Sequence, residues 1–452
     1  MPERSLIFVP LTTNIYEFGI VGMGPAGIGV AMELKNTTSM KDIVCFERGS
    51  LNSSECFSVS NNVCCCSDVC NVISGVGGAS TFSSGKISDF PAGSGLTTFF
   101  DSEYQLRELL NHCIQIIDKG VGLRKICIDE SKKNEAYLYY KEKQIEYKYY
   151  DVYEFDGDNY RLYLKKTVQD MMEEGLQLYH CTEVVKIQRD PSDSYYQVHA
   201  RISNGEIEIS VRNLIIATGA LDPEDNILEA MHTKTTSRYE IGVRIEAPSE
   251  SFKDVLSTHG DLKLKYDKGR TYCVTQNGIV LAYQTKGVRF LEGCANNVGP
   301  TGFTNLAILI KQEETQMILD FLEQYRKKYR GTPIVQRYID YKAFQKTSSK
   351  INASFGEAQY ADINELFPDR INREIKCFIK DVLIEAMGIP ENMIVMFAPE
   401  LKVLHDLQIN SNFEVKPRLY IIGAATGKFR GILQSFCSGI RCGQLLATYA
   451  GT

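Results

Sequence analysis

Apolar residues occur along this chain in short runs that are separated by glycines and by amphipathic stretches. Residues 18–21 form one such run, a glycine-rich turn follows at once, and residues 26–34 have the pattern of a helix. Residues 43–46 form the next apolar run. Because strand and helix patterns alternate in this order, the sequence predicts one β-α-β unit of about 30 residues.

The next part of the chain begins with residues 52–96, which are rich in Gly, Ser and Cys. So long a loop inside a compact domain is usually functional. Further elements are predicted as helices over 104–119 and 160–174, strands within the tyrosine-rich stretch 137–163, a hairpin of strands 195–202 and 206–211 around Asn204-Gly205, and a buried strand over 214–218 that ends at Gly219.

Beyond Gly219 the pattern becomes that of a different sheet. The predicted elements there are strands over 240–247, 271–274 and 279–283, followed by helices over 304–327 and 370–387. Near the C-terminus, a buried strand over 419–422 and a glycine-containing helix over 431–449 return to the first pattern.

The turn of the first unit reads Gly22-Met23-Gly24-Pro25-Ala26-Gly27, which fits G-x-G-x-x-G. Gly22 permits the tight turn off the strand, Gly24 lets a pyrophosphate approach the backbone, and Gly27 lets the helix pack close to the sheet. The helix N-terminus adds free N–H groups and a positive dipole end. The sequence therefore predicts a dinucleotide site.

An acidic residue is expected at the end of the second strand, where its carboxylate accepts the ribose hydroxyls of an adenosine. Glu47, followed by Arg48, stands there. With the strand before the glycines and the helix after them, this makes the fingerprint specific. The predicted fold class is α/β, with a discontinuous Rossmann-type domain that binds the dinucleotide (14–235 and 398–452) and a second α+β substrate domain (236–397).

FAD is predicted rather than NAD because G-x-G-P-A-G, followed by Glu-Arg-Gly after the second strand, resembles flavoproteins. An apolar strand ending in Ala217-Thr218-Gly219 is shared by this class, and the strand before Gly423 usually delivers the ribityl chain. The helix after it directs N–H groups to the flavin pyrimidine, where negative charge develops on reduction. No second G-x-G-x-x-G follows a strand, so transient NAD(P)H or another electron partner is left open.

Residues 74–86 read S-G-V-G-G-A-S-T-F-S-S-G-K. They resemble the signature S-G-[FW]-G-G-A-G-x-[FY]-S-D-G-K of bacterial FAD-dependent dehydrogenases of unassigned substrate, which belong to the glutathione-reductase-like, two-dinucleotide-binding flavoproteins. The resemblance continues in order at 241–246, at 271–273 before Asn277-Gly278, at 304–310 and at 427–432. It implies FAD as cofactor and a hydride-transfer reaction.

Two residues depart from that family. Ser84 stands where the family has Asp, and Ala424 replaces the Asp that normally accepts a hydrogen bond from a ribityl hydroxyl. The loss of this Asp has three possible consequences: FAD binds more weakly, another group accepts the hydrogen bond from the ribityl hydroxyl, or the protein no longer catalyses a reaction. The residues predicted to contact the cofactor are Gly22, Gly24, Pro25, Ala26, Gly27, Glu47, Arg48, Gly77, Gly78, Ala79, Ser80, Val184, Thr218, Gly219, Gly423, Ala424, Gly431 and Ile432.

Three cations are predicted to act in catalysis. Lys86 and Arg430 lie in glycine-rich loops that should approach the flavin, where a cation stabilises the reduced anion. Arg244 and Glu246 share one face of a strand because they are two residues apart. They are expected either to hold a substrate carboxylate and amine or to pair with each other. Weaker candidates are Tyr272, Asn277 and, as an acid-base group, His405.

Several cysteines precede residues 74–86, which we call the glycine loop. Cys65 and Cys70 among them have the C-x4-C spacing of a flavin-linked disulfide. In disulfide reductases such cysteines follow a Gly-Gly pair, whereas here they precede one. Structural thiols are therefore favoured over redox activity and over metal binding, which needs four well-spaced ligands.

Composition sets the remaining limits. The 452 residues suggest two or three domains. A net charge of −6 without a clustered basic face argues against nucleic acid. Apolar runs of strand length predict no membrane span. The first 14 residues lack a small-residue cleavage site, so no signal peptide is predicted. A cytoplasmic protein with reduced cysteines is expected, although the chain has 14 of them.

The predicted function is an FAD-dependent oxidoreductase, a dehydrogenase or reductase that transfers a hydride between flavin N5 and a small organic substrate. The alternatives are a flavin oxidase or monooxygenase, a prenyl-chain reductase, and a non-catalytic flavin-binding protein. The flavin ring is expected at the domain junction. We expect residues 75–86 to line one side, the turn 427–431 to lie at the pyrimidine edge, and Lys86 and Arg244 to be the cations nearest an acidic substrate.

Overall fold

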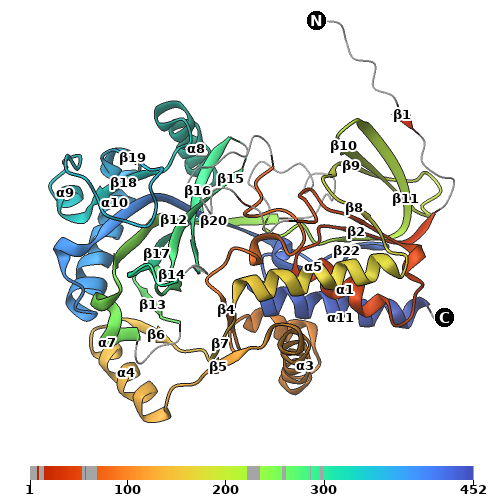
Figure 1. Cartoon of the computed structure of the whole chain (residues 1–452), viewed down its shortest axis with the longest axis horizontal. Coiled ribbons are helices and arrows are strands. Elements are labelled where there is room, and N and C mark those ends of the chain that lie inside the picture. The colour runs from red at the N-terminus through yellow and green to blue at the C-terminus, as the bar shows by residue number, and fades with distance from the viewer. Residues whose placement is uncertain are drawn as a thin grey trace, which may run out of the picture.

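The computed structural model describes residues 8–9, 15–52, 56, 69–220, 235–256, 261–285, 287–295 and 299–450. They form two bodies that lie side by side, one built on a sheet with a parallel centre and the other on an antiparallel sheet (Figure 1). This architecture confirms the predicted α/β class with a Rossmann-like sheet and a second α+β part. None of the helices in the described ranges is long and apolar enough to cross a membrane.

The first sheet has the order β21-β22-β11-β2-β3-β8, and its five strands from β22 to β8 are parallel. Strands β9, β10 and β11 form an antiparallel meander, and β1 pairs with β11. The bounds are Phe8–Val9 for β1, Tyr16–Val21 for β2, Ile43–Phe46 for β3, Gln177–Tyr179 for β8, Glu183–Arg189 for β9, Tyr196–Ile202 for β10, Gly205–Ile216 for β11, Glu414–Lys416 for β21 and Leu419–Ile421 for β22.

Alternating side chains cover the two faces of this sheet. Ile43 and Cys45 of β3 belong to the core under the helices, whereas Val44 and Phe46 belong to the core under the meander. All four are buried because helices cover one face and the meander covers the other. The covering helices are α1 (Pro25–Leu34), α3 (Glu103–Val121), α5 (Gly157–Glu173) and α11 (Ile432–Ala450).

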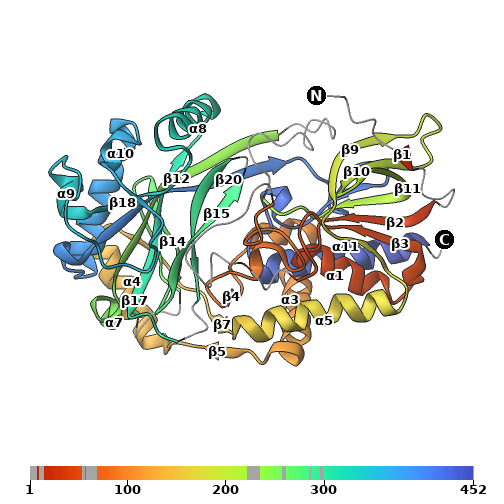
Figure 2. The same ribbon diagram turned by 45° about the horizontal axis from the view of Figure 1, so that its top comes forward.

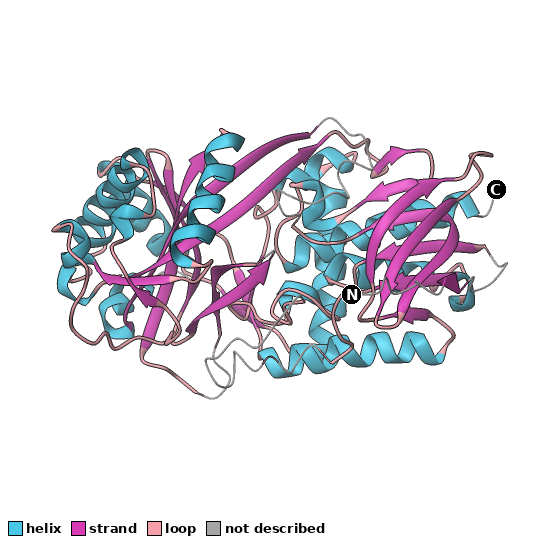
Figure 3. Cartoon of the chain, turned by 90° about the horizontal axis from the view of Figure 1, so that it is seen from above, coloured by secondary structure: helices cyan, strands magenta, loops and turns pink. Residues whose placement is uncertain are grey.

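The second sheet has the order β19-β18-β20-β12-β17-β14-β13-β6, in which the long strands β12 and β20 are inner neighbours. Figure 3 shows the strands and helices of the two bodies from above. Its strands are β6 (Glu146–Lys148), β12 (Thr235–Pro248), β13 (Lys263–Tyr266), β14 (Gly269–Thr275), β17 (Phe303–Gln312), β18 (Ile334–Arg337), β19 (Gln359–Tyr360) and β20 (Val395–Leu407). Helices cover one face, and the hairpin of β15 (Ile279–Thr285) and β16 (Val288–Cys294) lies on the other.

The helices of this second body are α7 (Lys253–Leu256), α8 (Thr315–Tyr329), α9 (Tyr338–Lys342), α10 (Asp369–Phe378) and the π-helix η6 (Ile379–Ala386). A three-stranded sheet of β4 (Lys86–Ser88), β7 (Val152–Glu154) and β5 (Arg124–Ile126) lies between the two bodies, and α4 (Glu130–Glu142) precedes β6. Because β6 joins the second sheet, part of the predicted segment 14–235 packs with the second body.

Three predicted elements differ from the structure. The helix predicted over 304–327 is the strand β17 followed by α8, because an apolar run that is buried on both faces fits either a helix or a central strand. The tyrosine-rich stretch predicted as strands begins with α4, and only β6 and β7 within it are strands. The segment 214–218 is not a separate strand but continues β11.

Candidate functional site

The glycine turn that follows β2 has the form that its sequence predicts. Gly22 has a φ of 97°, and a Cβ there would lie 2.6 Å from the carbonyl oxygen of Ala217. A Cβ on Gly27 would lie 2.0 Å from the carbonyl oxygen of Gly22. Both positions therefore require glycine, the first for its backbone conformation and for space, the second for the close approach of α1 to the strand.

Gly24 differs from these two positions. It is the N-cap of α1, Pro25 is the first helical residue, and a Cβ added at Gly24 would have no heavy atom within 4 Å. The amide groups of the first helical turn lack intrahelical partners and carry the positive end of the helix dipole. This combination of open backbone and helix N-terminus fits a pyrophosphate.

Glu47 holds the turn and the glycine loop together. Its carboxylate is buried, and Oε2 accepts a hydrogen bond from Met23 N at 2.8 Å. Its Oε1 accepts from Gly49 N and from Gly75 N, each at 2.8 Å. A carboxylate has about four acceptor sites, so it can accept a further donor in addition to these three. The predicted ribose contact is compatible with this arrangement.

The glycine loop lies directly against the turn. Gly77 N donates to Met23 O at 2.7 Å, and Gly77 and Gly78 both have positive φ. Ser80 Oγ lies 3.1 Å from Tyr160 Oη of α5, which fixes the loop on the helix layer. Ala79 is exposed. Arg48, next to Glu47, donates hydrogen bonds to Ser74 Oγ at the start of the glycine loop. Val184 is buried at the start of β9.

Two further segments end at the same edge of the parallel sheet. Thr218 follows β11, and its Oγ1 is buried without a hydrogen-bond partner in the described part of the chain. Gly219 has a φ of 81° and open space around it. Gly423 follows β22, and its Cβ position lies 2.8 Å from Ala26 Cβ. Ala424 comes next in the turn η8 (Gly423–Thr426) and is partly exposed.

The structure thus brings most of the predicted cofactor residues to one place. The turn after β2, the ends of β11 and β22 and the glycine loop meet at the carboxyl edge of the parallel strands, where ligands bind in open α/β sheets. Gly431 and Ile432 lie at the start of α11. In Figure 2, the loop that precedes β4 runs between α1 and the second body.

The glycine loop also contacts the second body. Ala295 N, just beyond β16, donates to Ser83 O at 2.8 Å, and the Cβ position of Gly85 lies 3.2 Å from Ala295 Cβ. Lys86 follows as the first residue of β4. Across the junction, the pKa of buried Asp261 is lowered, because the charges of Lys263 and Lys86 outweigh the effect of burial.

Arg430 reaches the second sheet from the other side of the junction. Its Nη1 lies 3.7 Å from Glu240 Oε2 of β12, and its side chain is 41% exposed. The turn that carries it is pressed onto β20, because the Cβ position of Gly427 lies 1.9 Å from His405 O. His405 is buried, with its Nδ1 2.9 Å from Ser237 Oγ.

Arg244 has a different environment from the one predicted. It is fully buried, and its Nε and Nη2 donate to the two oxygens of Glu400 at 2.8 and 2.9 Å. Nη1 donates to Asn305 Oδ1 at 2.8 Å and to Cys273 O at 3.3 Å, and Nη2 donates to Glu292 Oε1 at 3.3 Å. All five donors of the guanidinium are therefore engaged. The prediction that Arg244 contacts an acidic substrate is corrected, since no donor is left for one.

Glu246 lies on the same face of β12 as Arg244. Val243, which precedes Arg244, and Ile245, which lies between the two, point to the other face and enter the core under the helices. Its carboxylate accepts hydrogen bonds from the backbone N, at 2.8 Å, and from the hydroxyl of Ser354. Burial raises the pKa of Glu246 to about 6, against these bonds and the charge of Arg244. Within the described ranges no ion pair joins the two residues, so the predicted pairing of Arg244 with Glu246 is not found.

The cysteines within the described residues form no metal-binding group. Cys70 is buried with Cys56 and Cys294 in an apolar cluster between the glycine loop and the hairpin, which fits structural thiols. Cys65 lies outside the described residues. No disulfide links two described cysteines, and the described residues contain no group of His, Cys, Asp and Glu that could hold a metal ion.

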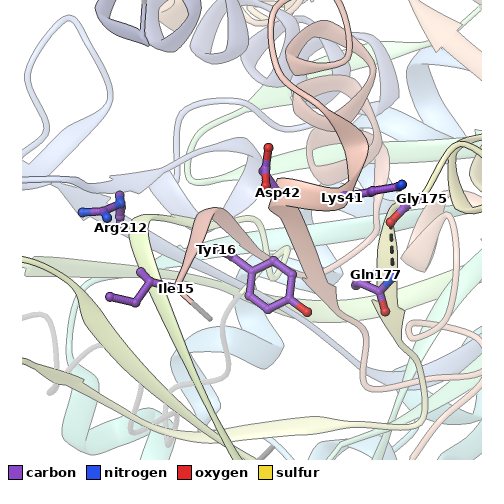
Figure 4. A pocket seen from close by; sticks show the side chains of 7 residues that line it. All are labelled: Ile15, Tyr16, Lys41, Asp42, Gly175, Gln177 and Arg212. Atoms are coloured by element: carbon purple, nitrogen blue, oxygen red, sulfur yellow. Dashed lines mark hydrogen bonds between the residues drawn. The ribbon is translucent and has the colours of Figure 1, made fainter. Parts of the chain in front are cut away.

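A surface pocket lies at the opposite edge of the parallel sheet (Figure 4). Tyr16, Asp42 and Gln177, which line it, stand at or next to the amino ends of β2, β3 and β8. Because the glycine turn is at the carboxyl ends of these strands, this pocket does not belong to the candidate site. Asn277 is exposed in the turn after β14.

The signals that sequence reasoning missed are four charged residues beside Tyr272. They are Lys263, Arg270, Glu292 and Lys402, which lie on β13, β14, β16 and β20. Two pairs, Arg270 with Tyr272 and Glu400 with Lys402, have the two-residue spacing that places side chains on one face of a strand. That spacing was the only signal in the sequence.

No protein-family model and no curated protein matches this chain. Among solved structures, it is similar to OxyS anhydrotetracycline hydroxylase from Streptomyces rimosus, with 12% identity, a TM-score of 0.42, and coverage of 97% of this chain and 63% of that one. It is also similar to the rebeccamycin biosynthetic enzyme REBC, with 11% identity, a TM-score of 0.39, and coverage of 98% and 64%.

Glycine oxidase from Geobacillus kaustophilus is similar at 14% identity, with a TM-score of 0.39 and coverage of 96% of this chain and 95% of that one. The chain therefore spans 64% and 63% of the lengths of REBC and OxyS and nearly the whole length of the oxidase. Similarity at this level assigns neither a family nor an activity. The resemblance to the bacterial FAD-dependent dehydrogenases remains a prediction from the sequence.

Proposed function

We propose that this protein is an FAD-dependent oxidoreductase that acts on a small organic substrate at the junction of its two bodies. The observation that carries the proposal is the turn after β2. There Gly22 and Gly27 are required by conformation and contact, Gly24 is open above the N-terminus of α1, and Glu47 is held at the end of the next strand.

Each part of this edge has a role toward the cofactor. The first turn of α1 would bind the pyrophosphate through its N–H groups, and Glu47 would accept a ribose hydroxyl. Thr218 supports the fit because its buried hydroxyl has no partner within the described ranges, and a bound cofactor would supply one. The N-terminus of α11, after Gly431, would face the flavin pyrimidine.

FAD supplies hydride transfer at its N5 when it is bound; the chain supplies position and charge. The glycine loop, which contacts both the turn after β2 and the end of β16, would form one wall of the reaction space. Lys86 and Arg430 would provide positive charge from the two sides of the junction.

The direct test is the identity of the cofactor. Purified protein should release FAD, and neither FMN nor NAD, on denaturation. Anaerobic dithionite should then bleach the flavin absorbance as a chemical control, and bleaching by NADH or by NADPH would identify that nucleotide as an electron donor. Protein refolded with FAD that shows no flavin binding would contradict the proposal.

Ala424 offers a second prediction. A carboxylate at this position would accept a hydrogen bond from a ribityl hydroxyl, which is worth about 1.5–3 kcal/mol for a charged acceptor. Ala424→Asp should therefore slow FAD dissociation by about tenfold or more, measured as flavin fluorescence released after dilution. Gln177→Glu, which adds the same charge at the opposite edge of the sheet, should leave the rate unchanged. Faster FAD loss from Ala424→Asp would mean that another group already fills this place.

A further inference from the structure

Tyr272 of β14 stands among three cations. Nζ of Lys263 and Nζ of Lys402 lie 5.5 and 5.2 Å from the centre of its ring, and Cζ of Arg270 lies 4.9 Å from it. Each distance is within the range in which a cation is attracted by the face of an aromatic ring. Cations from three different strands therefore lie beside this one partly exposed ring.

The backbone at this position is specialised as well. The pairing of β14 with β17 shifts register between Tyr272 and Thr275, and Cys273 in the bulge has a φ of 49°. A non-glycine residue in this region is strained, and bulges often re-aim a side chain beside a functional site. The carbonyl oxygen of Cys273 accepts a hydrogen bond from Arg244 at 3.3 Å, which holds the bulge in place.

Ion pairs extend from Tyr272 into one connected group, which we call the junction network. Its cations are Arg244, Lys263, Arg270, Lys402 and Arg430, and its carboxylates are Glu240, Asp261, Glu292 and Glu400. Five positive charges face four negative charges, so the network has an excess of one positive charge. A partly desolvated site with such an excess favours an anion.

The network has an inner and an outer part. Arg244 and Glu400 have no exposed side-chain surface. Outside them, the side chains of Lys402, Lys263 and Arg270 are 15%, 21% and 24% exposed. The buried pair fixes the strands, while solvent, and therefore a ligand, reaches the outer cations around Tyr272.

Two cations from the first body add positive charge beside the outer part. Arg430, in the turn before α11, lies 3.7 Å from Glu240, which already binds Arg270 through Nε at 2.8 Å. Lys86, at the end of the glycine loop, lies close enough to Asp261 to lower its pKa together with Lys263, against the effect of burial. Both segments border the proposed cofactor edge, so the excess charge lies where a substrate would meet the cofactor.

We propose that the substrate is a small organic anion, a carboxylate or a phosphate, bound over Tyr272 by the outer cations of the junction network and by Lys86. The location beside the flavin rests on the proposed function, but binding of the anion can be measured whether or not flavin is present.

The test uses three probes of similar size: benzoate, phenyl phosphate and the neutral benzamide. Isothermal titration calorimetry on the purified protein, whose FAD content is measured on the same sample, gives the three dissociation constants. At least one of the two anions should bind about tenfold more tightly than benzamide, and added salt should weaken the anion alone. Comparison of benzoate with phenyl phosphate shows which anion the site prefers.

Variants that are expected to change anion affinity in opposite directions test whether the charges of the junction network and of Lys86 bind the anion. Arg430→Met and Lys86→Met should each weaken the anion about tenfold and leave benzamide unchanged. Glu240→Gln should strengthen anion binding, because it raises the excess charge, and a gain cannot come from a damaged fold. Lys253→Met removes an exposed lysine, 70% accessible, outside the network and should change nothing.

Three results would overturn the inference. One is the absence of binding by both anions at millimolar concentration, and another is equal affinity for anions and benzamide. The third is a shift of the flavin reduction potential in Arg430→Met and Lys86→Met without a change in anion affinity, which would mean that these cations serve the cofactor. A protein that lacks FAD but still binds the anion with the expected pattern would contradict the proposed function alone.

Discussion

Replacing Arg244 with methionine is expected to lower the free energy of unfolding by about 3–5 kcal/mol, because removal of one partner leaves a buried charge uncompensated. Arg244 and Glu400 are both fully buried and form a bidentate pair. Burial alone would lower the pKa of the guanidinium, but Glu400 and Glu292 raise it, so Arg244 remains charged. Urea denaturation monitored by circular dichroism measures the change.

The double variant Arg244→Met/Glu400→Met should recover part of this loss. Replacing both members of a buried pair with apolar side chains is often nearly neutral, although Asn305 Oδ1 and Cys273 O lose a donor. Arg201→Met is the matched control, since Arg201 forms an ion pair with Glu183 and both side chains are about half exposed. Its effect should stay within about 0.5 kcal/mol. An Arg244→Met variant as stable as the control would show that Glu400 is satisfied by other groups.

The sequence predicts the first body well because its signals are local. Gly22 to Gly27 lie within one turn, and the apolar run before them and the acid after them fall in a single β-α-β unit. Each requirement can be read from neighbouring residues: φ above zero at Gly22, space at Gly27, an acid at the end of the next strand. The predicted fold class and this turn are therefore found in the structure.

The second body was harder to predict because its elements are defined by partners far away in sequence. The run Phe303–Gln312 is apolar on both faces, since helices cover one side of the sheet and the hairpin β15–β16 lies on the other. Such a run has no period that separates strand from helix. Segment 130–142 is likewise helical, and it packs with a sheet whose strands other than β6 begin at Thr235 or later in the chain.

The residues of the candidate site also differ in how well the sequence predicts their surroundings. Glu47 and the glycines were found from spacing, whereas the environment of Arg244 depends on Glu292, Asn305 and Glu400 from three other strands. A strand position shows which face a side chain occupies, as it did for Arg244 and Glu246. It does not show which charges meet there, and those charges decide whether an arginine is available to a ligand.

Replacing Glu47 with alanine is expected to weaken FAD binding by about tenfold or more, because a charged acceptor contributes about 1.5–3 kcal/mol per hydrogen bond. The structure adds a second effect. Met23 N, Gly49 N and Gly75 N all donate to this carboxylate, so the variant also frees three backbone donors that hold the turn and the glycine loop together. The apoprotein should therefore melt at a lower temperature. Loss of affinity alone does not distinguish a ribose contact from a disordered loop.

A comparison of ADP with 2′,3′-dideoxy-ADP separates the two effects. The ligands differ only in the ribose hydroxyls that Glu47 is proposed to accept, so disorder of the loop weakens both equally and cancels in their ratio. The parent protein should bind ADP about tenfold more tightly than the dideoxy analogue, and in Glu47→Ala the ratio should fall to about one. Glu183→Ala, at an exposed position on β9, should keep the parent ratio. If both ligands weaken together in Glu47→Ala while their ratio stays that of the parent, Glu47 organises the loop and the ribose is bound by another group.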